Sequence, residues 1–252
     1  MTNPKNDSYK NQLLRRLNPG DLGLLQPHLE LCDLKLKMTL EKADSEIETV
    51  YFLEDGIASV VATASGKEAE VGLVGFEGMT GAALVMGADY AAHECYVQSP
   101  GNALRIAAAP FKTALANSPT LRLFLLRYVH YFHIQTSYTA LINARSNLEE
   151  RLARWLLMCD DRIDGDRLAI THEFLSVMLG ARRPGVTVGL QELEGRGLIY
   201  SRRGEVHIRD RSGLAACAGG TYGKPEADYV RLVGDIAPSR HAGRRPLESA
   251  IG

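Results

Sequence analysis

The longest uninterrupted helical segment of this chain lies near its centre. Residues 121–143 contain neither glycine nor proline, and Pro119 stands just before them, in the first turn, where a helix tolerates proline. Apolar side chains recur along the segment with helical spacing. A single long helix therefore separates an N-terminal part of the chain from a C-terminal part.

One side of this helix has the heptad spacing of a coiled coil. The seam positions alternate at intervals of four and three residues: Leu121, Leu125, Tyr128, Phe132, Gln135, Thr139 and Ile142. A second stripe packs on the chain's own N-terminal part in this interpretation: Phe124, Tyr131 and Tyr138. Because apolar residues occupy two faces, we expect the heptad seam to be the interface of a homodimer. The alternative is one amphipathic helix buried in its own domain.

Short strand-like runs dominate the N-terminal part. Two short helices are expected first, and the strands then follow at residues 49–53, 57–63, 68–74, 94–98 and 103–107. Asp55 and Gly56 predict a hairpin turn between the first two strands. Ser65 and Gly66 predict the next turn. Many short strands with frequent glycines indicate a β-barrel or a double-sheet roll.

The C-terminal part carries the pattern with the clearest function. Thr171 is a helix cap, Gly180 marks a tight turn, and a second helix starts at Arg183 with Pro184 in its first turn. A basic hairpin follows around residues 202–204. This order predicts a winged helix-turn-helix. The alternative is a small helical domain with an ordinary hairpin.

A winged helix-turn-helix contacts DNA through few side chains. The second helix enters the major groove, where an arginine can pair with a guanine, and the wing contacts phosphates. The predicted DNA contacts are Thr171, His172, Arg182, Arg183, Thr187, Val188, Gln191, Arg202 and Arg203. The whole chain has a net charge of −1, but residues 182–211 hold seven arginines and four acidic residues. This local excess of positive charge favours phosphate contact, although a solvated charged surface would have the same composition.

Several other classes of function find no support in the sequence. No Walker loop, G-x-S-x-G elbow or H-E-x-x-H motif occurs, so we expect no catalytic residues. The four cysteines, Cys32, Cys95, Cys159 and Cys217, are too far apart for a zinc or iron–sulfur motif, so we expect no metal site. No apolar run could cross a bilayer, and the N-terminus lacks a signal peptide. We therefore expect a cytoplasmic protein without membrane contact.

Four stretches of the chain resemble the Crp/Fnr family of bacterial transcription regulators. They lie at residues 51–60, 150–158, 179–187 and 194–199 and read YFLEDGIASV, ERLARWLLM, LGARRPGVT and EGRGLI. The similarity covers roughly residues 13–214. It implies a cyclic-nucleotide-binding-like roll, which is a double-stranded β-helix (jelly-roll-like) domain, a dimerising helix and a C-terminal DNA-binding domain. The resemblance places base-contacting positions on Arg183, Pro184 and Val188.

The resemblance also indicates where an effector would bind. Cyclic-nucleotide binders of the family use a Gly-Glu pair and an Arg-Ser pair, and Thr136 and Ser137 occupy helix positions where such proteins contact the base. The candidate effector-pocket residues are therefore Gly81, Ala82, His93, Glu94, Thr136 and Ser137. Ala82 lacks the ribose-binding carboxylate, and Glu94 would repel a phosphate. Cyclic AMP is not the expected effector, no cofactor is predicted, and an unknown effector stays open. Haem binding by available histidines also stays open.

The sequence thus predicts an α+β protein with four segments. Residues 11–117 form the roll, 118–146 the dimerisation helix, 147–217 the winged helix-turn-helix, and 218–252 a flexible tail. The expected function is a Crp/Fnr-type transcription regulator that binds double-stranded DNA as a homodimer at a pseudo-palindromic operator. RNA polymerase is a further candidate partner. The alternative function is a small-molecule sensor module that acts through protein partners.

Overall fold

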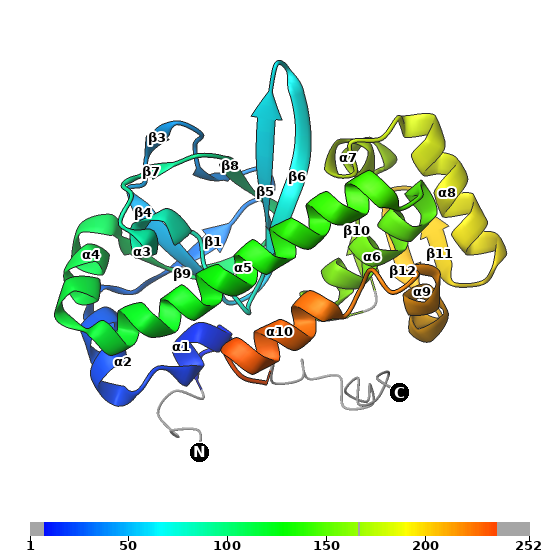
Figure 1. The fold of residues 1–252 in the computed structure, drawn as a ribbon. Helices are drawn as coiled ribbons and strands as arrows, with labels where there is room; N and C mark the ends of the chain where they lie inside the picture. The colour runs from blue at the N-terminus through cyan, green and yellow to red at the C-terminus, as the bar shows by residue number, and fades with distance from the viewer. Residues whose placement is uncertain (1–7, 166, 236–252) are drawn as a thin grey trace.

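The computed structural model describes residues 8–165 and 167–235 of the chain (Figure 1). The long helix α5 (Pro119–Arg145) runs along a β-rich N-terminal part, and a smaller helical C-terminal part lies around the C-terminal end of this helix. This arrangement confirms the predicted α+β class and the order of roll, long helix and winged helix-turn-helix.

Two short helices, α1 (Gln12–Arg16) and α2 (Pro19–Leu25), open the chain and a 3-10 turn, η1 (Gln26–His28), follows. The side chain of Asn11 caps α1 by accepting hydrogen bonds from the N–H groups of Leu13 and Leu14. Its amide nitrogen also donates to the carbonyl oxygens of Leu53 and Gly78, at 2.8 Å each. One buried side chain therefore caps the helix and fixes it to the roll.

The roll consists of antiparallel strands in two main sheets. The strands are β1 (Glu30–Leu34), β2 (Thr39–Glu41), β3 (Ser45–Glu46), β4 (Thr49–Leu53), β5 (Ile57–Ala64), β6 (Lys67–Val74), β7 (Tyr90–Ala91), β8 (Glu94–Ser99) and β9 (Gly101–Ala107). One sheet has the order β1-β9-β4, the other has the order β2-β8-β5-β6, and β3 pairs with β7. Buried apolar side chains from both main sheets meet between them.

The predicted hairpin at Asp55 and Gly56 is wrong. Strand β4 pairs with β9, whereas β5 pairs with β6 and β8, so the chain changes sheets at this turn. A Cβ atom on Gly101 would lie 2.3 Å from the carbonyl oxygen of Asp55, and one on Gly56 would lie 2.5 Å from that of Ser99. The glycines thus permit two backbone segments to cross closely at a corner of the roll.

The turn predicted at Ser65 and Gly66 is confirmed. Both residues have positive φ, at 51° and 73°, and they join β5 and β6 in a long hairpin. Strand β6 also lies against helix α7 (His172–Met178) of the C-terminal part (Figure 1). A Cβ atom on Gly180 would lie 3.9 Å from that of Ala69. The hairpin is therefore one point of contact between the roll and the C-terminal part.

Helix α5 buries the seam that the sequence predicts for a dimer. Together with α3 (Ala82–Met86) and α4 (Ala108–Asn117), it covers the roll. The seam residues Leu121, Leu125, Tyr128, Gln135 and Ile142 are no more than 4% exposed, and Phe132 and Thr139 are half-buried. The residue assignment of the dimer interface is therefore wrong, because the stripe with regular heptad spacing packs on the chain's own roll.

Polar contacts of α5 explain why this stripe faces inward. The side-chain amide of Gln135 bonds to both backbone groups of Leu73: its oxygen accepts from the N–H at 2.7 Å, and its nitrogen donates to the carbonyl at 3.3 Å. The hydroxyl of Tyr128 donates to the carbonyl oxygen of Met79. On the opposite side of the helix, Leu123 and Leu141 are 55% and 54% exposed. The apolar surface that remains open is a different stripe from the predicted one.

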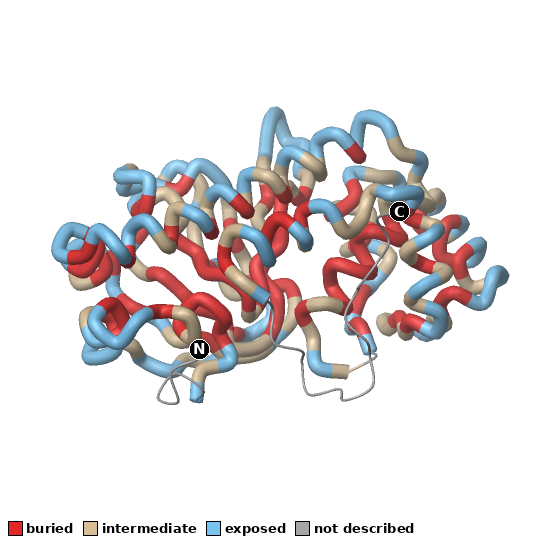
Figure 2. The backbone as a smooth tube through the Cα atoms, turned by 60° about the horizontal axis from the view of Figure 1, so that its bottom comes forward, coloured by how far each residue is buried: buried red, intermediate tan, exposed pale blue. Residues whose placement is uncertain are grey.

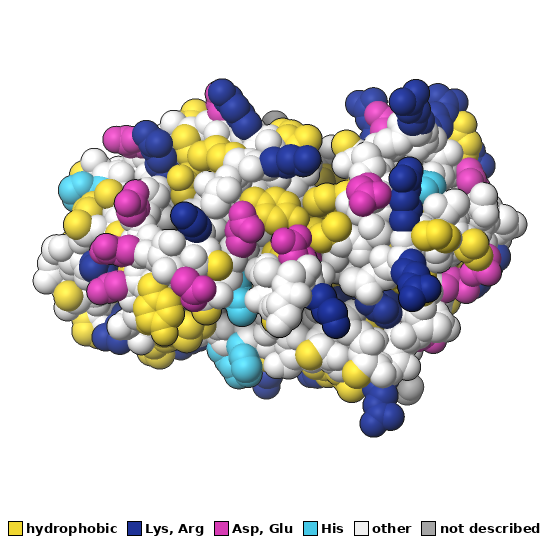
Figure 3. Space-filling view, turned by 90° about the horizontal axis from the view of Figure 1, so that it is seen from above, with side chains coloured by type: hydrophobic (Ala, Val, Ile, Leu, Met, Phe, Trp, Pro, Cys, Tyr) yellow, Lys and Arg dark blue, Asp and Glu magenta, His cyan; other side chains and the backbone are white. Residues whose placement is uncertain are grey.

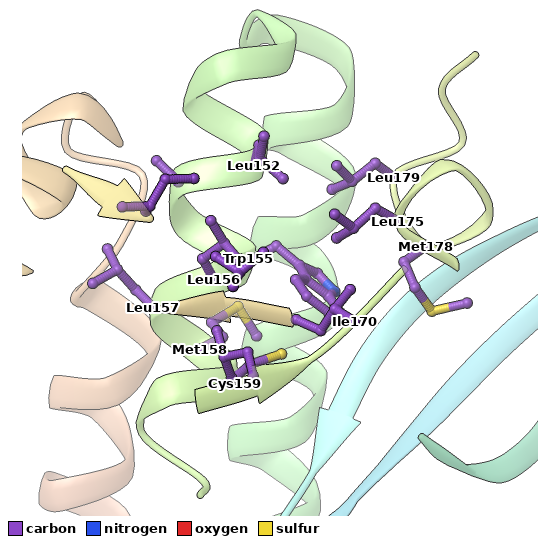
Figure 4. Close-up of a cluster of buried hydrophobic side chains, with 14 of the residues drawn as sticks. Leu152, Trp155, Leu156, Leu157, Met158, Cys159, Ile170, Leu175, Met178 and Leu179 are labelled. Atoms are coloured by element: carbon purple, nitrogen blue, oxygen red, sulfur yellow. The ribbon is translucent and has the colours of Figure 1, made fainter. Parts of the chain in front are cut away.

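The C-terminal part is built around helix α6 (Leu148–Asp160). Its other elements are β10 (Arg167–Ala169), α7, α8 (Arg183–Gly195), β11 (Ile199–Arg202), β12 (Glu205–Ile208) and α9 (Arg211–Cys217). The strands form a small sheet of order β10-β12-β11. Trp155 and Leu156 of α6 pack with Leu175 of α7 in a core that also includes Leu73 of the roll (Figure 4). Buried residues thus continue from one part into the other (Figure 2).

The predicted flexible tail is wrong for residues 224–232. They form helix α10 (Lys224–Leu232), which packs against α5. Pro225 lies in its first turn, and Tyr229 is fully buried. Residues 236–252, which include the basic end of the predicted tail, lie outside the described residues.

No helix in the described part of the chain is both long enough and apolar enough to span a membrane.

Candidate DNA-binding site

Helices α7 and α8 meet at a tight turn in the C-terminal part. The hydroxyl of Thr171 caps α7 by accepting a hydrogen bond from the N–H of Phe174 at 3.1 Å. Gly180 turns the chain with φ of 54°, and α8 then begins at Arg183 with Pro184 in its first turn. The sequence therefore sets the beginning of both helices through local capping and turn chemistry.

Helix α8 has one buried side and one open side. Val186, Leu190 and Leu193 are no more than 1% exposed and pack into the core around α6. The open side carries the remaining predicted contacts at exposed positions: Arg182, Arg183, Val188 and Gln191. The side chain of Val188 is 50% exposed. A convex helix of this kind has the dimensions that the major groove admits.

Two of the predicted contacts also connect the two helices. The hydroxyl of Thr187 donates to the carbonyl oxygen of Arg183 at 3.1 Å, and it lies 3.0 Å from Nδ1 of His172. Both residues are only half-buried. Their contact braces α7 against α8, and it leaves part of each side chain open to a ligand.

Arg183 is held only weakly in the unbound protein. Its guanidinium lies 3.7 Å from the carboxylate of Glu173, and the two side chains are 67% and 70% exposed. An ion pair with this exposure stabilises a protein very little. The guanidinium of Arg183 can therefore leave Glu173 at little cost to stability.

The wing adds a second basic surface beside α8. Strands β11 and β12 are joined by a two-residue turn at Arg203 and Gly204, and Arg202 and Arg203 are exposed as predicted. Arg202 Nε donates to the hydroxyl of Tyr200 at 2.7 Å. The guanidinium carbons of Arg202 and Arg209 lie 5.1 Å and 4.8 Å from the centre of the Tyr200 ring. The ring thus orders two cations by cation–π contact.

Sequence reasoning missed Arg209, Tyr200 and Arg167 as parts of this surface. In the sheet register, Tyr200 and Arg167 both lie opposite His207, so they share its outward side. The signal was present as an alternation of buried and exposed residues in the hairpin. Figure 3 shows Lys and Arg side chains gathered over the C-terminal part of the molecule.

The candidate effector-pocket residues do not form an open anion site. The N–H of Gly81 donates to the carboxylate of Glu41, whose pKa is raised by burial. His93 is exposed, and the hydroxyls of Thr136 and Ser137 both donate to the carbonyl oxygen of His133 at 2.8 Å. Glu94 is half-buried at the start of β8, and Ala82 is half-buried in α3. Among the described residues, no group of three or more His, Cys, Asp or Glu could hold a metal ion.

A further set of charged residues lies buried where the roll meets α6. Arg162 bonds through Nε to the carboxylate of Glu77 at 2.8 Å and through Nη2 to the hydroxyl of Tyr131 at 3.1 Å. Glu70 accepts hydrogen bonds from Trp155 Nε1 and from the Ser59 hydroxyl, at 2.7 Å each. These contacts tie the C-terminal part to the roll.

Burial strongly affects the acidic group of this junction. The surroundings of Glu70 raise its pKa to about 7, mainly because burial disfavours the charged carboxylate. Hydrogen bonds from Ser59 and Trp155 and the charges of Arg154 and Arg162 act in the opposite direction. Glu70 therefore changes its protonation near neutral pH.

Comparisons with known proteins agree with this geometry. The sequence profile of the Crp-like helix-turn-helix domain matches residues 150–217, the segment that contains all but the first two residues of α6 together with α7, α8, the wing and α9. Residues 150–217 therefore form a Crp-like helix-turn-helix domain. A domain of this family implies that the C-terminal part of the chain binds DNA. A search of curated proteins finds no match.

Solved structures of Crp/Fnr regulators share the fold. A crp/fnr-family regulator from Eubacterium rectale has a TM-score of 0.66 at 18% identity, over 82% of this chain and 98% of its own. FixK2 from Bradyrhizobium japonicum has a TM-score of 0.63 at 15% identity, over 75% and 96%. A CRP-family regulator from Thermus thermophilus has a TM-score of 0.61 at 20% identity, over 75% and 97%. At these identities the likeness shows the fold alone.

Proposed function

We propose that the protein is a Crp/Fnr-type transcription regulator that binds a pseudo-palindromic operator as a homodimer and does so without cyclic AMP. The observation that carries the proposal is the open side of α8, where Arg182, Arg183 and Gln191 are exposed beside the basic wing. One such surface contacts a single half-site. Two of them, about 34 Å apart in a dimer, would contact successive turns of the major groove on one side of the duplex.

The open stripe of α5 supports pairing between two chains. Leu123 and Leu141 are more than half exposed, and Ile134 between them is half-buried. Exposed apolar side chains in a line along one helix are typical of an interface. The dimer therefore uses this stripe in place of the seam expected from the heptad spacing.

The binding of cyclic AMP is disfavoured by the contact between Gly81 and Glu41. In the resemblance to cyclic-nucleotide binders, Gly81 lies where the phosphate is held. Here its N–H already donates to a carboxylate of the chain itself. A cyclic phosphate would have to displace Glu41 and accept a position near its negative charge. The ring of Phe132 packs over Gly72, where a Cβ atom would lie 2.7 Å from it. This ring occupies space between α5 and the roll.

Selection from a pool of random duplexes, with no small molecule added, tests the proposal. We expect enrichment of a pseudo-palindrome with half-sites about one helical turn apart. Adding cyclic AMP should leave the enrichment and the affinity unchanged. No enrichment with or without a cell extract would contradict DNA binding at an operator and favour a sensor module that acts through protein partners. Enrichment only in the presence of cyclic AMP would contradict DNA binding that is independent of cyclic AMP.

The dimer is tested separately by charge in the open stripe. Leu141→Glu should yield a monomer in light scattering and lower the affinity for the selected duplex, because a carboxylate would be buried between the chains. Val230→Glu, at another exposed apolar position on α10, is the matched control and should remain dimeric. A dimeric Leu141→Glu variant would contradict the assigned interface.

A further inference from the structure

The chain beyond the Crp-like domain returns to the roll. We call residues 221–233 the strap; they follow α9 and include α10. The profile of the Crp-like domain ends at residue 217, so the strap is an addition to that domain. In Figure 1, α10 runs beneath α5 from the side of α9 towards α1. The strap therefore connects the two parts of the molecule a second time.

The first half of the strap is bound to the C-terminal part. The hydroxyl of Tyr222 donates to Asp161, just after α6, at 2.6 Å. Arg211 of α9 donates to the same hydroxyl at 2.7 Å and also pairs with Asp160 and Asp161. Tyr222 is thus fixed from two sides, by an acid at the end of α6 and by a cation at the beginning of α9.

The second half of the strap is part of the core of the roll. Tyr229 is fully buried, and its ring meets that of Tyr131 of α5 edge-on, with the centres 4.8 Å apart. Its hydroxyl donates to the carbonyl oxygen of Glu77 at 2.8 Å. Val233 lies in the same buried cluster as Leu13 and Leu14 of α1. This end of the strap is therefore anchored by burial as well as by a hydrogen bond.

Two connections between the C-terminal part and the rest of the molecule restrict the rotation of the C-terminal part more than a single connection does. The C-terminal part leaves α5 through Ser146 and Asn147, a short extended link between two helices. A single link of this kind permits rotation about a hinge. The strap closes the chain into a ring across the junction, where Arg162 and Glu77 already pair. Rotation of α8 relative to α5 would require Tyr222 or Tyr229 to leave its partners.

We propose that Tyr222 and Tyr229 of the strap are positioning residues for DNA binding, which fix the angle between α8 and the dimer helix α5. The strap thereby sets the separation and rotation of the two α8 helices in the dimer. In this protein a segment of the same chain, the strap, fixes the angle between α8 and α5. The inference rests on the proposed operator-binding dimer.

The spacing of the operator half-sites provides the test. A chain that ends at Ala218 lacks the strap, and a chain that ends at Asp235 keeps it and is the matched control. Both are measured on the selected duplex and on the same duplex with one base pair inserted between the half-sites. The insertion turns one half-site by about 35° relative to the other.

We expect the full chain and the control to discriminate strongly between the two duplexes. The chain without the strap should lose about tenfold or more of that discrimination, because its domains can adjust to the inserted base pair. An equal loss of affinity for both duplexes, or no change for either, would overturn the proposal and leave the strap with a purely structural role.

Milder variants keep the test informative if the shortened chain does not fold. Tyr222→Phe and Tyr229→Phe retain the rings and remove one hydroxyl each. Either should relax the discrimination in a smaller degree while thermal unfolding shows a folded dimer. Unaltered discrimination in both variants and in the double variant would contradict a positioning role for these hydroxyls.

Solution scattering gives a readout that needs no operator. Loss of the strap should increase the radius of gyration of the dimer, because the C-terminal parts can then move away from the rolls. If the full chain selects no duplex, the proposed function fails while this measurement still decides the role of the strap. An unchanged radius of gyration in a folded dimer would overturn it.

Discussion

Two arginines show how burial divides the charges of this molecule into two kinds. Arg162 is 4% exposed at the junction and bonds to Glu77 and Tyr131. Arg183 is 67% exposed on α8 and has one distant ion pair. The same guanidinium therefore holds two parts of the protein together in one place and stays available to DNA in the other.

The largest effect is expected at Arg162. Arg162→Met should lower the free energy of unfolding by about 3–5 kcal/mol, because it leaves the carboxylate of Glu77 buried without its partner. Urea unfolding measures it. The double variant with Glu77→Leu should recover part of the loss, since both charges are then removed. If the free energy of unfolding fell by less than about 1 kcal/mol, Arg162 would contribute no more to stability than a surface charge does.

The next effect concerns the pH dependence of stability at Glu70. Its folded pKa of about 7 lies above the ordinary value of 4.5, so the folded protein keeps a proton that the unfolded chain releases between these values. The free energy of unfolding should therefore fall as the pH rises through this window, by up to about 3 kcal/mol. Glu70→Gln, measured by urea unfolding at several pH values, should lack this contribution. Identical pH profiles for both proteins would contradict it.

At Arg183 the expected effect is on binding alone. Arg183→Ala should lower the specific affinity for the selected duplex by about 1–3 kcal/mol and relax specificity at one base position. Its free energy of unfolding should change by no more than about 0.5 kcal/mol. Fluorescence anisotropy and urea unfolding on the same sample test both statements. If Arg183→Ala lowered the free energy of unfolding as much as Arg162→Met, the two arginines would not differ in their contribution to stability.

The smallest effect is expected at the wing. Arg209→Ala should weaken binding to all duplexes alike and reduce the slope of log K against log salt by about 1, as for the loss of one phosphate contact. Arg105→Ala, at an exposed arginine of the roll that pairs with Glu30, is the control and should leave the slope unchanged. A change in base preference would instead make Arg209 a base contact.

Local signals in the sequence predicted much of the site. The cap at Thr171, the turn at Gly180 and the proline in the first turn of α8 each involve residues near one another in the chain. Their physical chemistry is complete within a few residues, so the helix-turn-helix followed from the sequence. The alternation of buried and exposed residues that places Tyr200 and Arg209 on the outer face of the hairpin is also local. The prediction used only the adjacent basic residues Arg202 and Arg203.

Features that depend on distant contacts were not predictable in the same way. The helical period of α5 shows that two stripes are apolar, but it does not tell which one meets the roll. That choice is made by partners such as Leu73 and Met79, far away in the sequence. The turn at Asp55 and Gly56 likewise has hairpin chemistry, while the pairing of β4 with β9 is decided by the whole roll.

Helix α10 was missed for another reason. A composition rich in glycine, proline and arginine made residues 218–252 resemble a flexible tail as a whole. The short helical signal within it, Pro225 in the first turn followed by Tyr229 and Val233 four residues apart, was averaged out. Composition describes a segment well only where no short part of it can bury a side chain.

The amide of Gln135 has a consequence for the protein in a crowded cell. Strand β6 is the last strand of its sheet, and an open edge of this kind can add a strand from another chain and start aggregation. Gln135 occupies both backbone groups of Leu73 on that edge. The outer end of the same strand begins with Lys67 and Glu68, whose charges oppose stacking. Helix α5 thus shields this part of the sheet edge from pairing with a strand of another chain.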